Sequence, residues 1–292
     1  MTAFRLETLW QGRAQLGEGP VWDGARGRLY WTDIIGRRLF RLDGLSGHPM
    51  VWDMPRPVGS FAVTADGGLL AAIGTGFARI DGDSGAVQAL DAGATAPETC
   101  LMNDGKADRA GNFICGAKDL QESSAIAPAF RLTQGRATGW GGWFTVFNGP
   151  AFSPDGETVY FADSPQKIIR RARYDAATGA LSDESPFAVL GPDDGYPDGM
   201  TVDADGFLWN AQWDGARLTR YAPDGRVDRM IPLPMRRPTS VAFAGPGLDV
   251  LVVTSAAKDQ DAADSHAGSV LALHGLGVRG LAETPVQMGD SV

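Results

Sequence analysis

Short apolar runs separated by turns rich in Asp and Gly recur along the whole chain. The segments are GPVWDGARGRLYWTD, GSFAVTADGGLLAAI, DGKADRAGNFICGAK, GPAFSPDGETVYFAD, DGMTVDADGFLWNAQ and TSVAFAGPGLDVLVV. Each segment has two apolar runs around an Asp- or Gly-containing turn, a pattern that predicts a β-hairpin. The second runs begin 40 to 48 residues apart, at Leu29, Leu69, Phe113, Val159, Phe207 and Val250. Six units with this spacing are typical of the blades of a β-propeller.

A third apolar run follows several of these hairpins and ends in another turn, as in RLFRLDGLSG, GFARIDGDSG, IIRRARYDAATG and RLTRYAPDG. We expect the first strand, FRLETLW, to pair with the last blade and close the ring, which removes exposed sheet edges. A β-sandwich also contains many short strands. The regular spacing favours an all-β fold of the six-bladed β-propeller class.

The repeats leave no room for a linker, so we expect residues 1–292 to form a single domain. Three stretches exceed the length of an ordinary hairpin turn, namely 118–147, 186–197 and 256–268. Long connections of this kind are candidate lids or rims of a site.

Charge and composition exclude several classes of partner. The net charge is −9 and no Lys/Arg cluster is present, so we expect no nucleic-acid partner and no attraction to an anionic membrane. The start, MTAFRLETLW, lacks the apolar core of a signal peptide, and no later segment reaches the length of a membrane span. Two cysteines are too few for a disulfide framework. We therefore expect a cytoplasmic protein that is a monomer or a weak homo-oligomer.

Polar residues occupy equivalent positions in five of the six repeats. They lie 9 to 11 residues before the second apolar run and are Glu18, Asn103, Asn148, Asp198 and Thr239. The second repeat offers only Val58 to Ser60. Because one strand of every blade borders the central channel, equivalent positions are expected to converge. Two carboxylates close to one axis are costly unless a cation compensates their charge.

Oxygen ligands without His or Cys suit Ca²⁺, Mg²⁺ or Mn²⁺, with Fe²⁺ and Zn²⁺ as alternatives. A metal site also explains Glu18, which stands between glycines in LGEGPVWD although glutamate favours neither turns nor strands. A single Asp or Asn before a strand is more often a turn or cap residue. The coincidence across repeats favours a metal site in the central channel, with one divalent metal held by Glu18, Asn148 and Asp198 as a set.

Four segments resemble the signature segments of the SMP-30/gluconolactonase/LRE family, which includes regucalcin and bacterial sugar lactonases. They follow one another in the family's order and are LGEGPVWD, NDGKADRAGNF, NGPAFSPDGETVYFAD and YPDGMTVDADGFLW. The resemblance implies a six-bladed propeller that holds one divalent metal through Glu18, Asn148 and Asp198. It also implies that Asn103 approaches the metal and the substrate, and that Asp104 lies at the edge of the site.

Two positions depart from the family's pattern. Members with sugar lactonase activity often carry Arg two residues before the equivalent of Asn103, where it contacts the substrate, and this chain has Leu101 there. The GTM that commonly follows is GAK, which introduces Lys118. Lys118 either supplies a replacement cation for the substrate or points to solvent, and the sequence leaves both open.

The metal site and the resemblance together predict a metal-dependent lactonase that hydrolyses a sugar lactone, an aldonolactone, to the free acid. The ion would polarise the carbonyl and activate water, with Asp198 as the candidate general base. One alternative is an arylesterase or phosphotriesterase on the same fold, which the less polar Leu101 favours. Another is a non-enzymatic metal-binding propeller, since LYWTD resembles the repeat of receptor-type propellers.

Other catalytic groups are not indicated. The chain has no G-x-S-x-G segment, and its histidines fall in or near turns outside the equivalent positions. Cys100 lies close to Asn103 and Cys115 falls in an apolar run, and we expect both thiols to be inert. The aromatic residues of GWGGWFTVF, at 140, 143 and 144, either line a sugar site or belong to the core, and the core is favoured.

Overall fold

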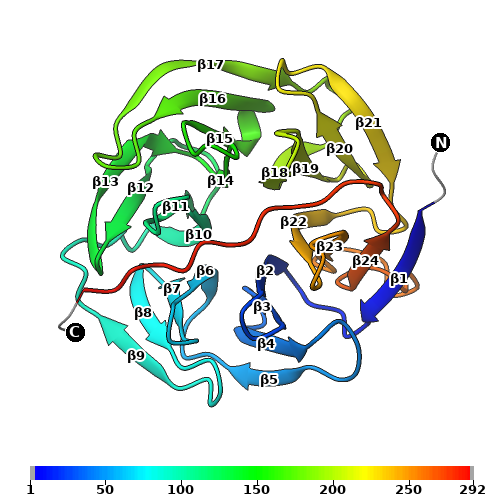
Figure 1. Cartoon of the computed structure of the whole chain (residues 1–292), viewed down its shortest axis with the longest axis horizontal. Coiled ribbons are helices and arrows are strands. Elements are labelled where there is room, and N and C mark those ends of the chain that lie inside the picture. The colour runs from blue at the N-terminus through cyan, green and yellow to red at the C-terminus, as the bar shows by residue number, and fades with distance from the viewer. Residues whose placement is uncertain (1–3, 290–292) are drawn as a thin grey trace. The chain divides into compact units, whose positions relative to one another are not determined.

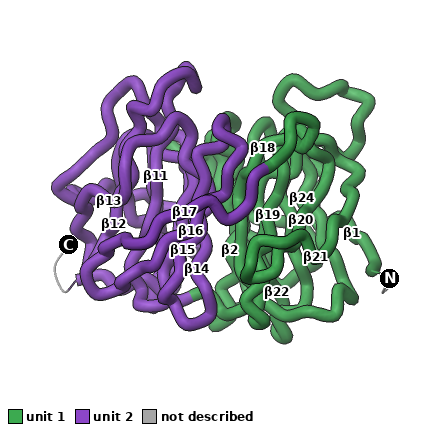
Figure 2. Tube along the Cα trace, turned by 90° about the horizontal axis from the view of Figure 1, so that it is seen from above, with its two compact units in different colours: residues 1–55, 190–283 green, residues 56–189, 284–292 purple. Residues whose placement is uncertain are grey.

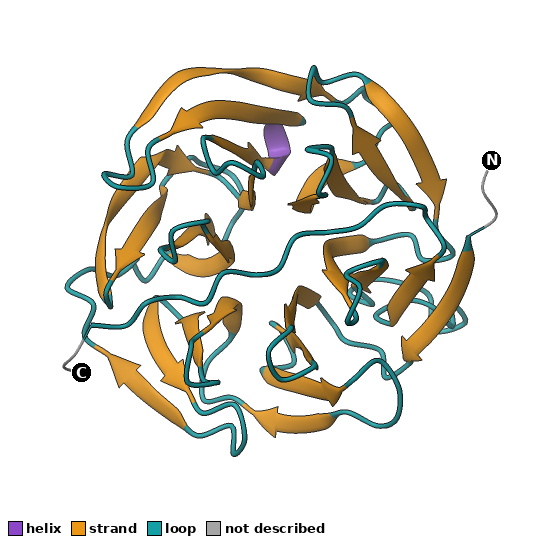
Figure 3. Cartoon of the chain, in the orientation of Figure 1, coloured by secondary structure: helices purple, strands orange, loops and turns teal. Residues whose placement is uncertain are grey.

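Strands make up nearly all the regular structure of the chain. The computed structural model describes residues 4–289, in which it has strands β1 to β24 and one short 3₁₀ helix, η1 (Ser164–Gln166). Figure 3 shows these strands joined by loops and turns. Within residues 4–289, no helix has the length and apolar character needed to cross a lipid bilayer. The predicted all-β class is confirmed.

The chain divides into two compact units, coloured separately in Figure 2. Unit 1 comprises residues 1–55 and 190–283, and unit 2 comprises residues 56–189 and 284–292. Each unit contains three four-stranded antiparallel sheets. Six such sheets, labelled by strand in Figure 1, confirm the predicted class of a six-bladed β-propeller with one sheet per blade. That both units belong to a single domain stays a prediction.

Unit 1 holds the first blade and the last two blades of the chain. The first is β2 (Gly17–Asp23), β3 (Arg28–Asp33), β4 (Arg38–Asp43) and β5 (Met50–Asp53). The next is β18 (Tyr196–Val202), β19 (Leu208–Trp213), β20 (Arg217–Tyr221) and β21 (Val227–Pro232). The last is β22 (Pro238–Ala244), β23 (Val250–Ser255), β24 (Val270–His274) and β1 (Arg5–Trp10).

Unit 2 holds the three central blades of the chain. The first is β6 (Val58–Val63), β7 (Leu69–Ile73), β8 (Gly76–Ile80) and β9 (Val87–Leu90). The second is β10 (Cys100–Ala107), β11 (Phe113–Asp119), β12 (Ala127–Thr133) and β13 (Arg136–Phe144). The third is β14 (Phe147–Phe152), β15 (Thr158–Asp163), β16 (Ile168–Tyr174) and β17 (Leu181–Val189).

The predicted pairing of the N-terminal strand with the last blade is confirmed. β1 runs antiparallel to β24, with Arg5 opposite His274 and Thr8 opposite Leu271. β1 thereby covers the edge of a sheet whose other three strands, β22 to β24, are the last strands of the described chain. An edge that is paired in this way offers no free backbone groups to another chain.

Burial falls from the second strand of each blade to the fourth. All residues of β7 and all but the first of β3 are buried, whereas β5 is mostly exposed. Continuous apolar runs are typical of strands covered on both faces, and mixed sequences are typical of strands at an edge. The apolar cores between blades contain stacked aromatic rings such as Trp31 and Phe40, whose centroids lie 5.0 Å apart.

The stretches expected to form lids differ from that expectation in part. Most of 118–147 is β12 and β13, and its longest irregular segment runs from Leu120 to Ile126. Trp140 and Phe144 are buried in the core of unit 2, and Trp143 is 63% exposed on β13. The prediction that these residues belong to the core is therefore confirmed for Trp140 and Phe144. Trp143 instead faces solvent from the same strand.

Candidate metal and substrate site

Every first strand of a blade is irregular at the position that the sequence singled out. The six first strands are β2, β6, β10, β14, β18 and β22. Their register shifts fall between Glu18 and Val21, Val58 and Ser60, Met102 and Gly105, Asn148 and Ala151, Pro197 and Met200, and Pro238 and Val241. A β-bulge turns a side chain away from the regular alternation of a strand. The candidate residues therefore lie within or next to bulges inside the first strands.

Glycines follow the candidate residues because the bulges require them. Gly19 and Gly149 have φ values of 54° and 84°, a region that favours glycine. Gly199 is required for a different reason, because a Cβ there would overlap the side chain of Ser240 on β22. A Cβ on Gly59 would overlap the backbone of Met102 on β10. The glycines around each candidate residue thus shape the bulge or let neighbouring first strands approach closely.

Unit 1 supplies the two carboxylates. Glu18 on β2 and Asp198 on β18 are 7% and 6% exposed, and β22 packs against both strands. Thr239 on β22 donates a hydrogen bond of 2.5 Å from Oγ1 to the carbonyl of Gly17. The amide of Asn210 donates to the carbonyl of Asp198 over 2.9 Å. The backbone on which each carboxylate stands is therefore fixed by a buried hydrogen bond.

Unit 2 supplies the two amides, and these contact each other. Asn103 Nδ2 donates to Asn148 Oδ1 over 3.0 Å and to the carbonyl of Phe147 over 2.8 Å. Asn148 Nδ2 donates to Ser164 Oγ over 2.7 Å. Both amide nitrogens are occupied by these bonds, so the amide oxygens are the atoms left with acceptor capacity. A side-chain oxygen with spare lone pairs is what a hard cation binds.

Two further aspartates hold the segments that lead into the candidate residues. Asp33 accepts hydrogen bonds from the backbone N–H groups of Gln15 and Leu16, each over 3.0 Å. Asp163 does the same for Thr145 and Val146, at 3.1 and 2.9 Å. Sequence reasoning missed both as positioning residues. The available signal was the Asp that ends both LYWTD and VYFAD.

Asp104 differs from the other carboxylates of unit 2. Burial raises the pKa of its carboxyl group to about 7, and hydrogen bonding from the Gly105 backbone N–H opposes that shift. The bond from Gly105 N to Asp104 Oδ1 is 2.7 Å long. Asp104 therefore exchanges its proton near neutral pH, within a segment that also carries Asn103.

Leu101 and Lys118 lie directly opposite each other on β10 and β11. The side chain of Lys118 is 17% exposed and its Nζ forms an ion pair of 2.6 Å with Glu122. Lys118 is therefore a mostly buried cation that is paired with Glu122, and it does not extend freely into solvent.

The donor chemistry of the candidate residues fits a hard divalent cation. Glu18, Asp198 and Asn148 offer oxygen atoms from buried side chains, and neither His nor Cys is among them. Within residues 4–289, no group of three His, Cys, Asp or Glu side chains is arranged to hold a metal ion, and the predicted set contains only two such residues. Ser60 Oγ and Asn210 Oδ1 are buried without a hydrogen-bond partner among the described residues.

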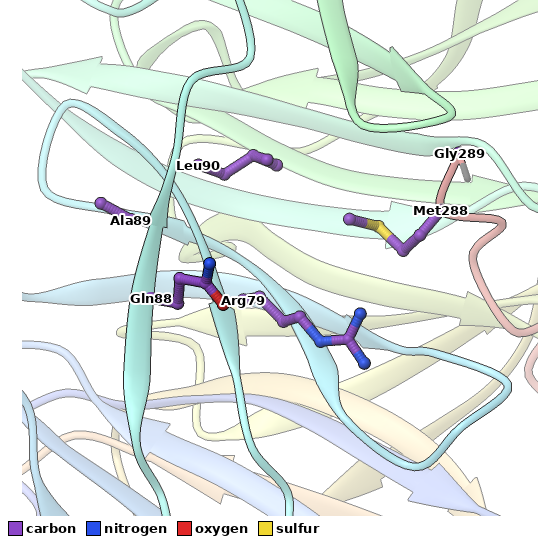
Figure 4. Close-up of a pocket in the computed structure, with 6 residues that line it drawn as sticks. All are labelled: Arg79, Gln88, Ala89, Leu90, Met288 and Gly289. Atoms are coloured by element: carbon purple, nitrogen blue, oxygen red, sulfur yellow. The ribbon is translucent and has the colours of Figure 1, made fainter. Parts of the chain in front are cut away.

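The cysteines and two surface clefts lie outside this chemistry. Both thiols are free and buried, and burial raises the pKa of Cys100 and of Cys115. One cleft lies beside β8, β9 and the C-terminal segment, and Figure 4 shows its lining residues, Arg79, Gln88, Ala89, Leu90, Met288 and Gly289. Another lies along β13 and the turn before β17. Neither is lined by a candidate residue.

The sequence is similar to a protein-family model and to proteins of known activity. A family model described as the SMP-30/Gluconolactonase/LRE-like region matches residues 16–257. Pentonolactonase XacC of Haloferax volcanii is 36% identical over 253 residues, which cover 85% of this chain and 84% of the relative. L-arabinolactonase of Azospirillum brasilense is 37% identical over 268 residues, which cover 88% of each chain.

Solved structures agree on the fold. The crystal structure of a calcium-binding protein, regucalcin, from Agrobacterium tumefaciens has a TM-score of 0.90 and 29% sequence identity with this chain. The match covers 97% of each chain. The similarity therefore spans all six sheets.

Proposed function

Because the chain belongs to the SMP-30/gluconolactonase/LRE-like family, we propose that it is a metal-dependent lactonase. It hydrolyses an aldonolactone, a cyclic sugar-acid ester, to the open acid. The names of the two sugar lactonases with 36% and 37% identity support a small sugar lactone as the substrate. The observation that carries the proposal is that Glu18, Asn103, Asn148 and Asp198 all stand at the bulges of first strands.

We propose Glu18, Asn148 and Asp198 as the ligands of one divalent ion. The calcium-binding regucalcin of similar fold supports Ca²⁺ as one candidate, and Mg²⁺, Mn²⁺, Zn²⁺ and Fe²⁺ accept the same oxygen donors. When bound there, such an ion would polarise the lactone carbonyl and lower the pKa of a water molecule.

Asp198 is the proposed general base. Its carboxylate accepts a proton from the attacking water while the water oxygen forms a bond to the lactone carbonyl carbon. The bond from that carbon to the ring oxygen then breaks, and Asp198 returns the proton to the leaving oxygen. The products are the carboxyl and hydroxyl groups of the open acid, so water is the only co-reactant.

The remaining candidate residues position the reactants. Asn103 holds the oxygen of Asn148 in place through the 3.0 Å hydrogen bond. Asn103, Asp104, Leu101 and Lys118 are proposed to line the substrate site from β10 and β11. The cytoplasmic location and the monomeric or weakly oligomeric state stay predictions from the sequence.

An esterase acting on aryl esters or phosphotriesters is the second candidate. The apolar Leu101, opposite Lys118 on the neighbouring strand, favours it because an aromatic leaving group packs well on an apolar side chain. Turnover of aldonolactones and aryl esters by the same metal-loaded protein separates the two functions. Turnover of neither class, with metal bound, would leave a non-enzymatic metal-binding propeller.

Two matched substitutions in one blade test the role of Asp198. Asp198→Asn removes the proposed base and should abolish lactone turnover while the protein stays folded. Asp205→Asn makes the same chemical change in the exposed β18–β19 turn, where the side chain is 69% exposed, and should retain turnover. Equal activity of both variants would contradict the assignment.

A further inference from the structure

An ion pair lies at the end of unit 2 that carries the two amides. Lys118 Nζ and Glu122 Oε1 are 2.6 Å apart, and their side chains are 17% and 50% exposed. We call Lys118 and Glu122 the rim pair. By contrast, the ion pair between Arg170 and Glu184 belongs to β16 and β17, the third and fourth strands of their blade.

Strand register places Lys118 next to the residues that the proposed function uses. Lys118 is opposite Leu101, which is two residues from Asn103, and residues opposite each other on antiparallel strands have Cβ atoms about 5 Å apart. Lys118 also forms a bridge to Val146, two residues before Asn148. Lys118 therefore lies beside both strands that supply the amides of unit 2, β10 and the start of β14.

The loop after β11 is built to hold Glu122. Asp119 accepts hydrogen bonds from the backbone N–H groups of Gln121, Ser123 and Ser124, at 3.1, 3.0 and 3.1 Å. Glu122 itself has a φ of 50°, a conformation uncommon for residues with a side chain. Its backbone N–H donates to the carbonyl of Asp119 over 3.0 Å. These contacts fix the loop in the form that brings the Glu122 carboxylate to Lys118.

Blade three in chain order, β10 to β13, differs here from the first and fourth blades. In the first and fourth blades, Asp33 and Asp163 at the end of the second strand hold the segment before the candidate residue. Asp119 ends the second strand of blade three, but its side chain accepts its hydrogen bonds from the following loop. In blade three, the Asp at the end of the second strand therefore orders the loop that carries Glu122.

The charge of the rim pair has a consequence for the substrate. An isolated lysine would attract an anionic group, whereas a lysine paired with a carboxylate has little net charge. The pair still offers ammonium donors and carboxylate acceptors side by side, which matches hydroxyl groups because each hydroxyl both donates and accepts. An anionic substituent at this place would meet the carboxylate of Glu122.

We propose that the rim pair selects uncharged polyhydroxylated lactones and excludes lactones that carry an additional acid group. This inference rests on the proposed lactonase function and names the substrate class that the same site accepts. Lys118 and Glu122 are specificity-determining residues that bind substrate hydroxyls, and the chemical step does not depend on them.

The test compares an uncharged aldono-1,4-lactone with an aldaro-1,4-lactone that carries a free carboxylate. The quantity measured is the ratio of kcat/KM for the uncharged lactone to kcat/KM for the anionic lactone. Glu122→Gln should lower this ratio about tenfold, through a lower KM for the anionic lactone, because Lys118 then acts as an unpaired cation. Lys118→Met should raise the KM for the uncharged lactone several-fold and leave the anionic lactone excluded.

Glu184→Gln is the matched control, since it removes one negative charge from a comparably exposed ion pair on β17. The ratio for Glu184→Gln should stay within twofold of wild type. A ratio that changes no more in Glu122→Gln than in Glu184→Gln overturns the role of the rim pair alone. Hydrolysis of neither lactone by wild-type protein contradicts the proposed function itself and overturns the rim-pair inference with it.

Discussion

The amide of Asn103 donates a hydrogen bond of 3.0 Å to the side-chain oxygen of Asn148. The two residues are 45 positions apart and stand at the bulges of adjacent first strands, β10 and β14. The contact therefore exists only because two repeats present equivalent positions to each other. It orients the oxygen that we assign to the metal, and this relationship leads directly to a first prediction.

Asn103→Ala should weaken divalent metal binding by about 10- to 100-fold, the usual cost of losing a group that orients a metal ligand. The fold should persist because the lost contacts are side-chain contacts at one bulge. Calorimetric titration of chelated protein with metal measures the affinity, and thermal unfolding in chelator measures the fold. An unchanged metal affinity would contradict the positioning role of Asn103.

Gly59→Ala should destabilise the protein by about 1–3 kcal/mol, the cost of forced overpacking. A Cβ at this position would overlap the backbone carbonyl groups of Met102 and Asn103, and backbone atoms cannot rotate away. Gly139→Ala is the control, since a Cβ there meets nothing within 4 Å. Denaturant unfolding should show a lower free energy of unfolding for Gly59→Ala and an unchanged one for Gly139→Ala. Equal stabilities would contradict the close approach of β6 and β10.

Tyr174→Phe should cost about 1.5–3 kcal/mol of stability without changing lactone turnover. The Tyr174 hydroxyl donates to Asp108 Oδ2 over 2.7 Å, and Asp108 is fully buried. Burial and the neighbouring Asp108 both raise the pKa of Tyr174, so the hydroxyl keeps its proton. Asp108 directly follows the last residue of β10, whereas Asn103 lies at the bulge inside that strand. Urea unfolding and kcat/KM measure the two effects, and a large loss of turnover in the folded variant would contradict a purely structural role.

The raised pKa of Asp104 predicts a pH dependence of stability. Its pKa is about 7 in the folded chain, against 3.8 for an ordinary aspartate, because burial disfavours the charged form. The folded chain thus holds this proton more tightly than the unfolded chain between these two values. The resulting contribution to stability is fully present below pH 4 and is lost as the pH rises through about 7.

Asp104→Asn removes this titration. The free energy of unfolding of the variant minus that of wild type should therefore be more than about 1 kcal/mol higher at pH 8 than at pH 4. Denaturant unfolding at both pH values, with chelator present in all samples, gives the difference. A difference between variant and wild type that does not change with pH would contradict the raised pKa.

The sequence predicted the blades because each hairpin has its own strong local pattern. Leu69 and Val250 begin buried second strands, and both were recognised as the start of an apolar run. Apart from β1, the fourth strands were not recognised, since strands such as β5 and β21 are mostly exposed and mixed in polarity. Such strands are specified by pairing with a third strand, which a single-sequence pattern does not show.

Sequence alone predicted those candidate residues that occupy equivalent positions in several repeats. Glu18 and Asn148 were found by their distance from the next apolar run, and the structure places both at bulges. Asp33 and Asp163 were missed because their role depends on backbone N–H groups 17 and 18 residues earlier in the chain. The pairing of Lys118 with Glu122 was equally hidden, since it depends on the loop geometry that Asp119 imposes.

The central claim is that one divalent ion, held by Glu18, Asn148 and Asp198, is required for lactone hydrolysis. Titration of chelated protein with a divalent ion, followed by the rate of aldonolactone hydrolysis, tests it most directly. The account predicts a rate near zero without metal and a plateau at one ion per chain. Full activity in the chelated protein, or no activity with any of the five candidate ions, would contradict it.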